Sequence, residues 1–93
     1  MQITEIQIEL IKPNNGLIGF ANLVVDGNIY LSSIAIHKKL NGDGYRLTYP
    51  NKGSFAIFYP INKETSNQIE QAVFGKLKDV MNKVKRDVQE IQS

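Results

Sequence analysis

Cysteine is absent from this 93-residue chain, which excludes disulfides, zinc–thiolate sites and cysteine nucleophiles. No apolar run approaches the roughly 20 residues that a membrane-spanning helix needs. The N-terminal residues, Met1 to Glu5, lack the basic region and the continuous apolar region of a signal peptide. We therefore expect a cytoplasmic protein without a membrane segment.

Length and composition indicate one small folded domain, residues 1–93. The chain is 42% hydrophobic and 22% charged, which is typical of a folded protein and not of a disordered one. No internal repeat or low-complexity tract interrupts it. A chain of this size buries only about 60–65% of its unfolded surface, so the core of a monomer should be thin.

The formal net charge is +2, and the basic residues gather in two places. One cluster lies between residues 37 and 52 and contains Lys38, Lys39, Arg46 and Lys52, against Asp43 alone. The other occupies residues 76–86. Such clusters are compatible with polyanion binding. Solvated lysines that lay their methylene stems along apolar surface are the more usual explanation of such clusters.

The first half of the chain predicts antiparallel strands. Apolar and polar residues alternate over Ile6–Leu10, the period of a half-buried strand. Further strands are expected over Leu17–Val25 and Asn28–Ile36. Asp26-Gly27 between them tolerates the positive φ angles of a type I′ turn, which predicts a hairpin.

A polar loop, Lys38–Gly44, leads to two shorter strands, Tyr45–Tyr49 and Phe55–Tyr59. Pro60 ends the strand pairing because proline has no N–H to donate. Within the first of these strands Tyr45 and Tyr49 share one face, and Arg46 lies on the other. A stacked arginine–tyrosine platform inside this strand is therefore not expected.

After Ile61 the period changes to that of a helix. The apolar positions recur in steps of three and four residues and are Ile69, Val73, Leu77, Val80, Val84, Val88 and Ile91. Thr65 and Gln68 have capping-box spacing, so the helix should begin between Asn62 and Ser66. The fold class is α+β, a small antiparallel sheet of about five strands followed by one long C-terminal helix, about residues 63–91.

Composition and spacing do not support an enzyme. His37 is the only histidine, and no motif around the serines makes one of them a nucleophile. Asn41-Gly42-Asp43-Gly44 lacks the other ligands of a calcium loop and is typical of turns. We expect no catalytic residue, no metal, no cofactor and no small-molecule substrate, with a small hydrolase using His37 as the remaining alternative.

Two spaced motifs precede the helix. A strand started by Gly44 ends in Pro50-Asn51-Lys52, and the next strand ends in Tyr59-Pro60-Ile61-Asn62. In their order and spacing, "SIAIHKKLNGDGYRLTYPNK" and "FYPINKETSNQIEQAV" resemble the stage V sporulation protein G family, the bacterial septation regulators. The similarity covers about residues 3–81.

The resemblance implies a homodimeric regulator that binds DNA and RNA. The candidate nucleic-acid-binding residues are Lys52, Arg46, Lys38, Lys39 and Lys63. Family members usually carry further basic residues where this chain has Gly53, and often an arginine near the position of Asn67. These departures favour an alternative, a protein-interaction or scaffold dimer with weakened nucleic-acid binding.

The strands themselves also predict a homodimer. Leu17-Ile18 and Leu23-Val24-Val25 leave no consistently polar side, and one helix can cover only one face of the sheet. An uncovered apolar face marks an interaction surface, and open sheet edges favour pairing with a second copy. We expect a dimer joined through strands or a sheet face.

Overall fold

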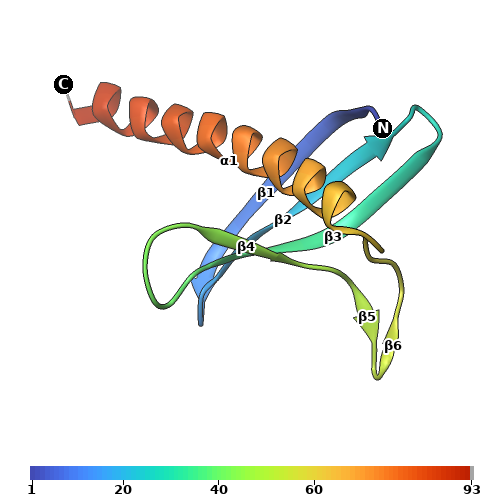
Figure 1. Cartoon of the computed structure of the whole chain (residues 1–93). Helices are drawn as coiled ribbons and strands as arrows, with labels where there is room; N and C mark the ends of the chain where they lie inside the picture. Colours follow the sequence, from blue (N-terminus) through green and yellow to red (C-terminus); the bar gives the residue numbers. More distant parts are fainter. Residues whose placement is uncertain (93) are drawn as a thin grey trace.

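The fold consists of a sheet, a separate hairpin and one long helix. The computed structural model describes residues 1–92, with side chains as far as residue 84. In chain order the elements are β1 (Ile3–Asn14), β2 (Leu17–Val25), β3 (Ile29–Lys38), β4 (Tyr45–Thr48), β5 (Asn51–Lys52), β6 (Phe55–Ala56) and α1 (Lys63–Gln92). Strands β1 to β4 form one antiparallel sheet in that order (Figure 1).

The α+β class is confirmed, but the strand Phe55–Tyr59 was predicted too long and in the wrong sheet. Only Phe55 and Ala56 are paired, and they pair with β5 in a separate two-stranded hairpin. Strand β4 stops at Thr48, just before Tyr49 and Pro50. Proline has no N–H for the ladder, so the chain leaves the sheet here. The hairpin therefore projects away from the body of the protein (Figure 1).

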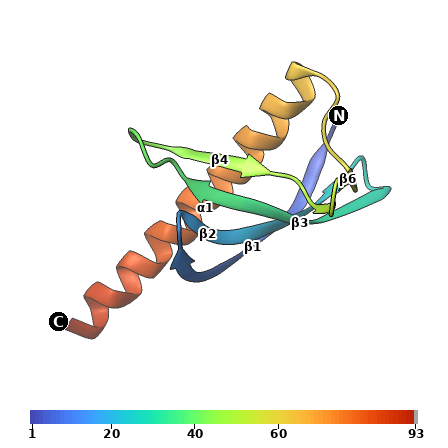
Figure 2. The same cartoon turned by 90° about the horizontal axis from the view of Figure 1, so that it is seen from below.

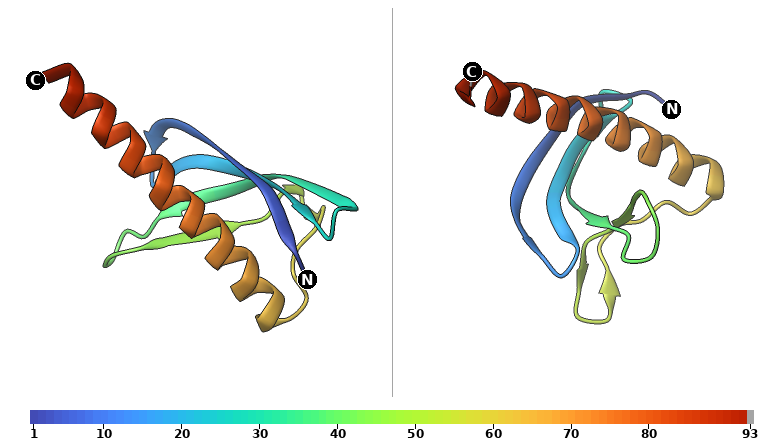
Figure 3. Two further views of the ribbon diagram at one scale, coloured as in Figure 1. Left: turned by 90° about the horizontal axis from the view of Figure 1, so that it is seen from above. Right: turned by 90° about the vertical axis from the view of Figure 1, so that its left-hand side faces the viewer.

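Helix α1 crosses one face of the sheet diagonally, and its C-terminal turns extend beyond the sheet edge (Figure 2 and Figure 3). The core lies between the two layers. Its buried residues are Ile18, Ala21, Leu23, Ile34, Ile36, Ile69, Val73 and Leu77. The predicted helix stripe is confirmed as far as Leu77. Val84 is 49% exposed because the helix has left the sheet there, and Val88 and Ile91 lie outside the described side chains.

The β2–β3 turn has the predicted geometry. Asp26 and Gly27 have φ angles of 53° and 67°, the positive values that a type I′ turn requires at both central positions. The Asn28 N–H donates to the Val25 carbonyl at 3.0 Å and closes the turn. Strand β3 begins at Ile29, the register partner of Val25, so the loop holds the three residues 26–28 and not the two predicted.

The start of α1 lies inside the predicted window, but its capping residue was predicted wrongly. The Asn62 side-chain oxygen accepts the Thr65 N–H at 2.7 Å. The Asn62 carbonyl accepts the Ser66 N–H at 3.1 Å, the first bond of the helix. Asn62 is thus the N-cap, and Thr65 already lies in the first turn.

Two irregular positions bend the sheet around Asn22 in the central strand β2. Glu5 and Ser33 have φ angles of 52° and 64°, and each adds an extra residue to its strand. The Ser33 N–H, displaced from the ladder, donates to the Asn22 side-chain oxygen at 3.1 Å. Such bulges increase local twist, so they strengthen the curvature of the sheet under the helix.

Candidate nucleic-acid interface

The predicted basic residues lie around β4 and the β5–β6 hairpin, at the edge of the sheet opposite β1. Lys38 ends β3, Arg46 lies in β4, Lys52 ends β5, and Lys63 is the first residue of α1. With Lys39 in the β3–β4 loop, all of them are exposed. Exposure makes each available to a phosphate, but it does not place them on one surface.

The strand register separates Arg46 from Lys39. Tyr45, Leu47 and Tyr49 pack against the core on the helix side, so Arg46 points to the opposite face. Lys39 instead borders a groove on the helix side, together with Tyr45. The alternation predicted for this strand is confirmed, and no arginine–tyrosine platform forms within it.

Arg46 has His37 as its cross-strand partner on β3. Burial, and then the Arg46 charge, lower the pKa of His37 below its usual value of 6.5, so the ring is neutral at neutral pH. The His37 Nε2 atom lies 2.9 Å from the Thr48 hydroxyl oxygen. Its partner there is a hydroxyl group and not the carboxylate that orients a catalytic histidine. Of this cross-strand pair, Arg46 carries the charge.

The β5–β6 hairpin holds Lys52 away from the sheet. Lys52 is the direct partner of Phe55, and the intervening turn uses Gly53 with a φ of 59°. The Ile57 N–H donates to the Pro50 carbonyl at 3.0 Å, which prolongs the pairing by one bond. Phe58 anchors the hairpin edge-on against the Tyr49 ring, with centroids 6.0 Å apart.

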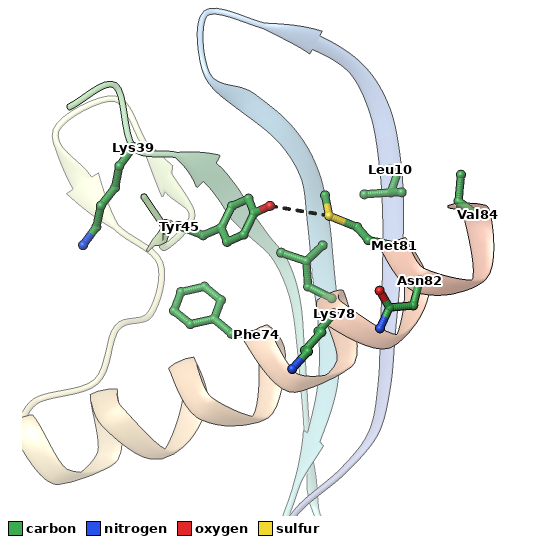
Figure 4. Close-up of a pocket in the computed structure, with 10 residues that line it drawn as sticks. Leu10, Lys39, Tyr45, Phe74, Lys78, Met81, Asn82 and Val84 are labelled. Carbon is green, nitrogen blue, oxygen red and sulfur yellow. Dashed lines mark hydrogen bonds between the residues drawn. The ribbon is translucent and has the colours of Figure 1, made fainter. Parts of the chain in front are cut away.

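An open apolar groove runs beneath the second half of α1, with a volume of about 1020 Å³. Figure 4 shows Tyr45, Phe74 and Met81 facing it, with Lys39 and Lys78 at its border. The Tyr45 hydroxyl donates to the Met81 sulfur at 3.5 Å, a weak bond. The groove is open where the helix passes the edge of the sheet (Figure 3).

Sequence reasoning did not single out the aromatic residues of the hairpin. Phe55 is 77% exposed and Tyr59 is 61% exposed. The available signal was the spacing of large apolar residues at every second position from Phe55 to Tyr59, a segment that was interpreted as an ordinary strand.

Within the part of the chain that the structure describes, no three His, Asp or Glu side chains gather closely enough to hold a metal ion. Over the same residues, no helix combines the length and apolar character that crossing a membrane requires.

The arrangement defines a class of protein: a small antiparallel sheet with a C-terminal helix and a lysine-bearing hairpin at one edge. No protein-family model matches the chain. A protein from Phytoplasma australiense named as septation protein SpoVG is 31% identical to it over 88 residues, covering 88% of each chain. The chain belongs to the SpoVG septation-protein family.

Proposed function

We propose that this protein is a cytoplasmic regulator connected with septation, which binds DNA or RNA mainly through backbone phosphates. The observation that carries the proposal is the placement of Lys52. It lies in the Pro50-Asn51-Lys52 motif on a hairpin that projects from the sheet, and its side chain is exposed (Figure 1). The name of the relative from Phytoplasma australiense supports the connection with septation.

Lysine suits this role because its ammonium is a compact charge on a flexible stem and can follow a phosphate without fixed geometry. Phosphate contacts carry no sequence information, so such a surface binds many sequences similarly. Arg46 adds a second cationic group on the outer face of β4, where its neighbour His37 is neutral. Lys63 adds another at the start of α1.

The test is the salt dependence of binding to random-sequence DNA and RNA. Each phosphate contact releases a counterion, so Lys52→Ala should flatten the slope of log affinity against log salt by about one unit. Lys12→Ala is the matched control, since Lys12 is also exposed but lies in β1, at the opposite edge of the sheet.

An unchanged slope for Lys52→Ala, with wild-type melting, would remove Lys52 from the interface. Equal effects of Lys52→Ala and Lys12→Ala would indicate a diffuse charge effect without a site. If no salt-dependent binding to either nucleic acid is measured, the proposed function is wrong.

The apolar groove favours a second candidate, a homodimer that acts as a protein-interaction scaffold. Leu10 and Val84 at the groove are 38% and 49% exposed, and Phe74 and Met81 are only partly buried. Apolar surface of this kind is what a second copy would cover. Sedimentation at micromolar concentration tests this, and a well-folded species at the 10.5 kDa mass of one chain would contradict the dimer.

A further inference from the structure

The segment that follows Gly53 exposes a large apolar side chain at every second position. The exposed fractions are 77% for Phe55, 62% for Ile57, 61% for Tyr59 and 86% for Ile61. Phe58 and Pro60, which alternate with them, are partly buried. Only Phe55 and Ala56 of this segment are in a strand, and from Ile57 onward the chain is irregular. Phe58 packs against the core, while the four exposed side chains form the outer edge of the segment.

Lys52 and Phe55 share one face of the hairpin. They are direct cross-strand partners, and the Cβ atoms of such partners are about 4.5–5.5 Å apart. A nucleotide presents an anionic phosphate beside a planar base, and this pair presents a cation beside a planar ring. Tyr59 is also exposed and lies between the hairpin and the start of α1.

The charge of the segment distinguishes between the possible occupants of this edge. Residues 50–63 contain two lysines, Lys52 and Lys63, and no acidic residue. Apolar side chains alone would suit a protein surface. Glu64 follows Lys63 directly, so the uncompensated charge of the segment is that of Lys52. Apolar rings beside such a cation suit a polyanion whose bases are accessible.

The other tyrosines near the basic residues are not available for stacking. Tyr45 lies against Phe74 with ring centroids 6.3 Å apart, and Tyr49 lies against Phe58. Both face the core, as the alternation of β4 requires. Aromatic rings beside basic groups are therefore presented to solvent on the hairpin and not on β4.

We propose that the outer edge formed by Lys52, Phe55 and Tyr59 binds single-stranded nucleic acid by stacking unpaired bases on the two rings. Lys52 holds the adjacent phosphate. In a duplex the bases stack on one another and their faces are covered, so only a single strand offers free base faces on which the two rings can stack. The inference rests on the proposed function and adds a preference for the single strand.

The experiment compares three labelled probes by fluorescence anisotropy: an oligothymidine strand, a duplex of the same length, and an abasic strand with the same phosphates. Phe55→Leu and Tyr59→Leu keep an apolar side chain but remove the π face. Stacking contributes about 1–3 kcal/mol per base, so each variant should weaken binding to oligothymidine about five- to 150-fold. Binding to the abasic strand and to the duplex should not change.

Tyr30→Leu is the matched control, because Tyr30 in β3 is 62% exposed, as Tyr59 is, but lies outside the hairpin. A second measurement uses Phe55→Trp, since the chain has no tryptophan of its own. Stacked bases should quench its fluorescence when oligothymidine binds, and a tryptophan introduced by Tyr30→Trp should not be quenched.

Two results overturn the stacking proposal and leave the proposed function in place. One is equal, salt-dependent binding of all three probes that the leucine variants do not alter. The other is a lowered sedimentation mass for Phe55→Leu without a change in nucleic-acid affinity, which would make the edge a protein interface. Absence of binding to every probe would overturn both proposals.

Discussion

Alanine at position 19 should destabilise the protein by about 2–3 kcal/mol. Gly19 pairs with Leu10 of β1 and with Ile36 of β3, in the middle of the sheet. A Cβ atom at this position would lie 2.5 Å from the Glu9 carbonyl oxygen and 3.2 Å from the Leu10 Cα. Ordinary contacts begin near 3.4 Å, so the Glu9 carbonyl must move by about 0.9 Å.

The obstacle is backbone, which cannot rotate away as a side chain can. A shift of β1 also displaces Ile8, which packs against the core. Overpacking typically costs about 1–3 kcal/mol, and the upper half of that range is expected because a whole strand must move.

Gly75→Ala is the matched control, since it makes the same chemical change with the opposite expected sign. Gly75 lies inside α1, is exposed, and has no atom within 4 Å of the Cβ that alanine would add. Alanine is the better helix former, so this variant should gain about 0.5–1 kcal/mol.

Thermal and urea unfolding, followed by circular dichroism at one fixed chain concentration, measure both effects. For a domain of this size, 1 kcal/mol shifts Tm by about 4–8 °C, so Gly19→Ala should lower Tm by roughly 10 °C or more. A Gly19→Ala protein as stable as wild type would refute the close approach of β1 to β2. Equal changes in Tm for Gly19→Ala and Gly75→Ala would mean that the loss of glycine's backbone freedom, and not the clash, determines the change in stability.

Two further substitutions test the turn and the buried tyrosine. Gly27→Val should destabilise the protein by about 1–2 kcal/mol. No atom lies within 4 Å of the Cβ that valine would add, so the destabilisation comes from the φ of 67° alone. An unchanged Tm would contradict this backbone geometry. Tyr49→Phe should be neutral or stabilise by up to about 1 kcal/mol, because the buried hydroxyl has no hydrogen-bond partner among the described residues. Burial, and then the charge of Glu70, raise the pKa of Tyr49 to about 12, as expected for a buried hydroxyl. If Tyr49→Phe lowers the free energy of unfolding in urea by more than about 1 kcal/mol, the hydroxyl is hydrogen-bonded.

Local patterns predicted the elements well because the interactions behind them span only a few residues. The alternation of Ile6 and Ile8, the Asp26-Gly27 turn and the helical repeat each depend on neighbours at most four positions away. The helix cap was missed although Asn62 is a strong N-cap residue, because the Thr65–Gln68 spacing matched a competing pattern. The bulges at Glu5 and Ser33 had no signal, since neither is the glycine expected at positive φ.

The candidate site was predicted residue by residue but not as a surface. The exposure of Lys38, Lys39, Arg46, Lys52 and Lys63 agrees with the ordinary behaviour of charged side chains. Their separation onto different faces depends on the register of β3 with β4, which places Arg46 beside His37. The exposure of Phe55 and Tyr59 runs against the preference of aromatic rings for burial, so composition alone could not have predicted it.

By itself, the sequence determined the α+β class, the β2–β3 hairpin and the face of α1 that meets the sheet, because these depend on periodicity and on the φ preferences of a few residues. Only the tertiary structure decided where the sheet ends and what it leaves uncovered. The chain leaves the sheet after β4, and Phe55 in the hairpin has no layer to pack under, whereas Phe58 packs against Tyr49. The helix is longer than the sheet it crosses (Figure 3). Burial depends on what lies opposite a residue, and none of the residues that the structure describes covers the outer edge of the hairpin.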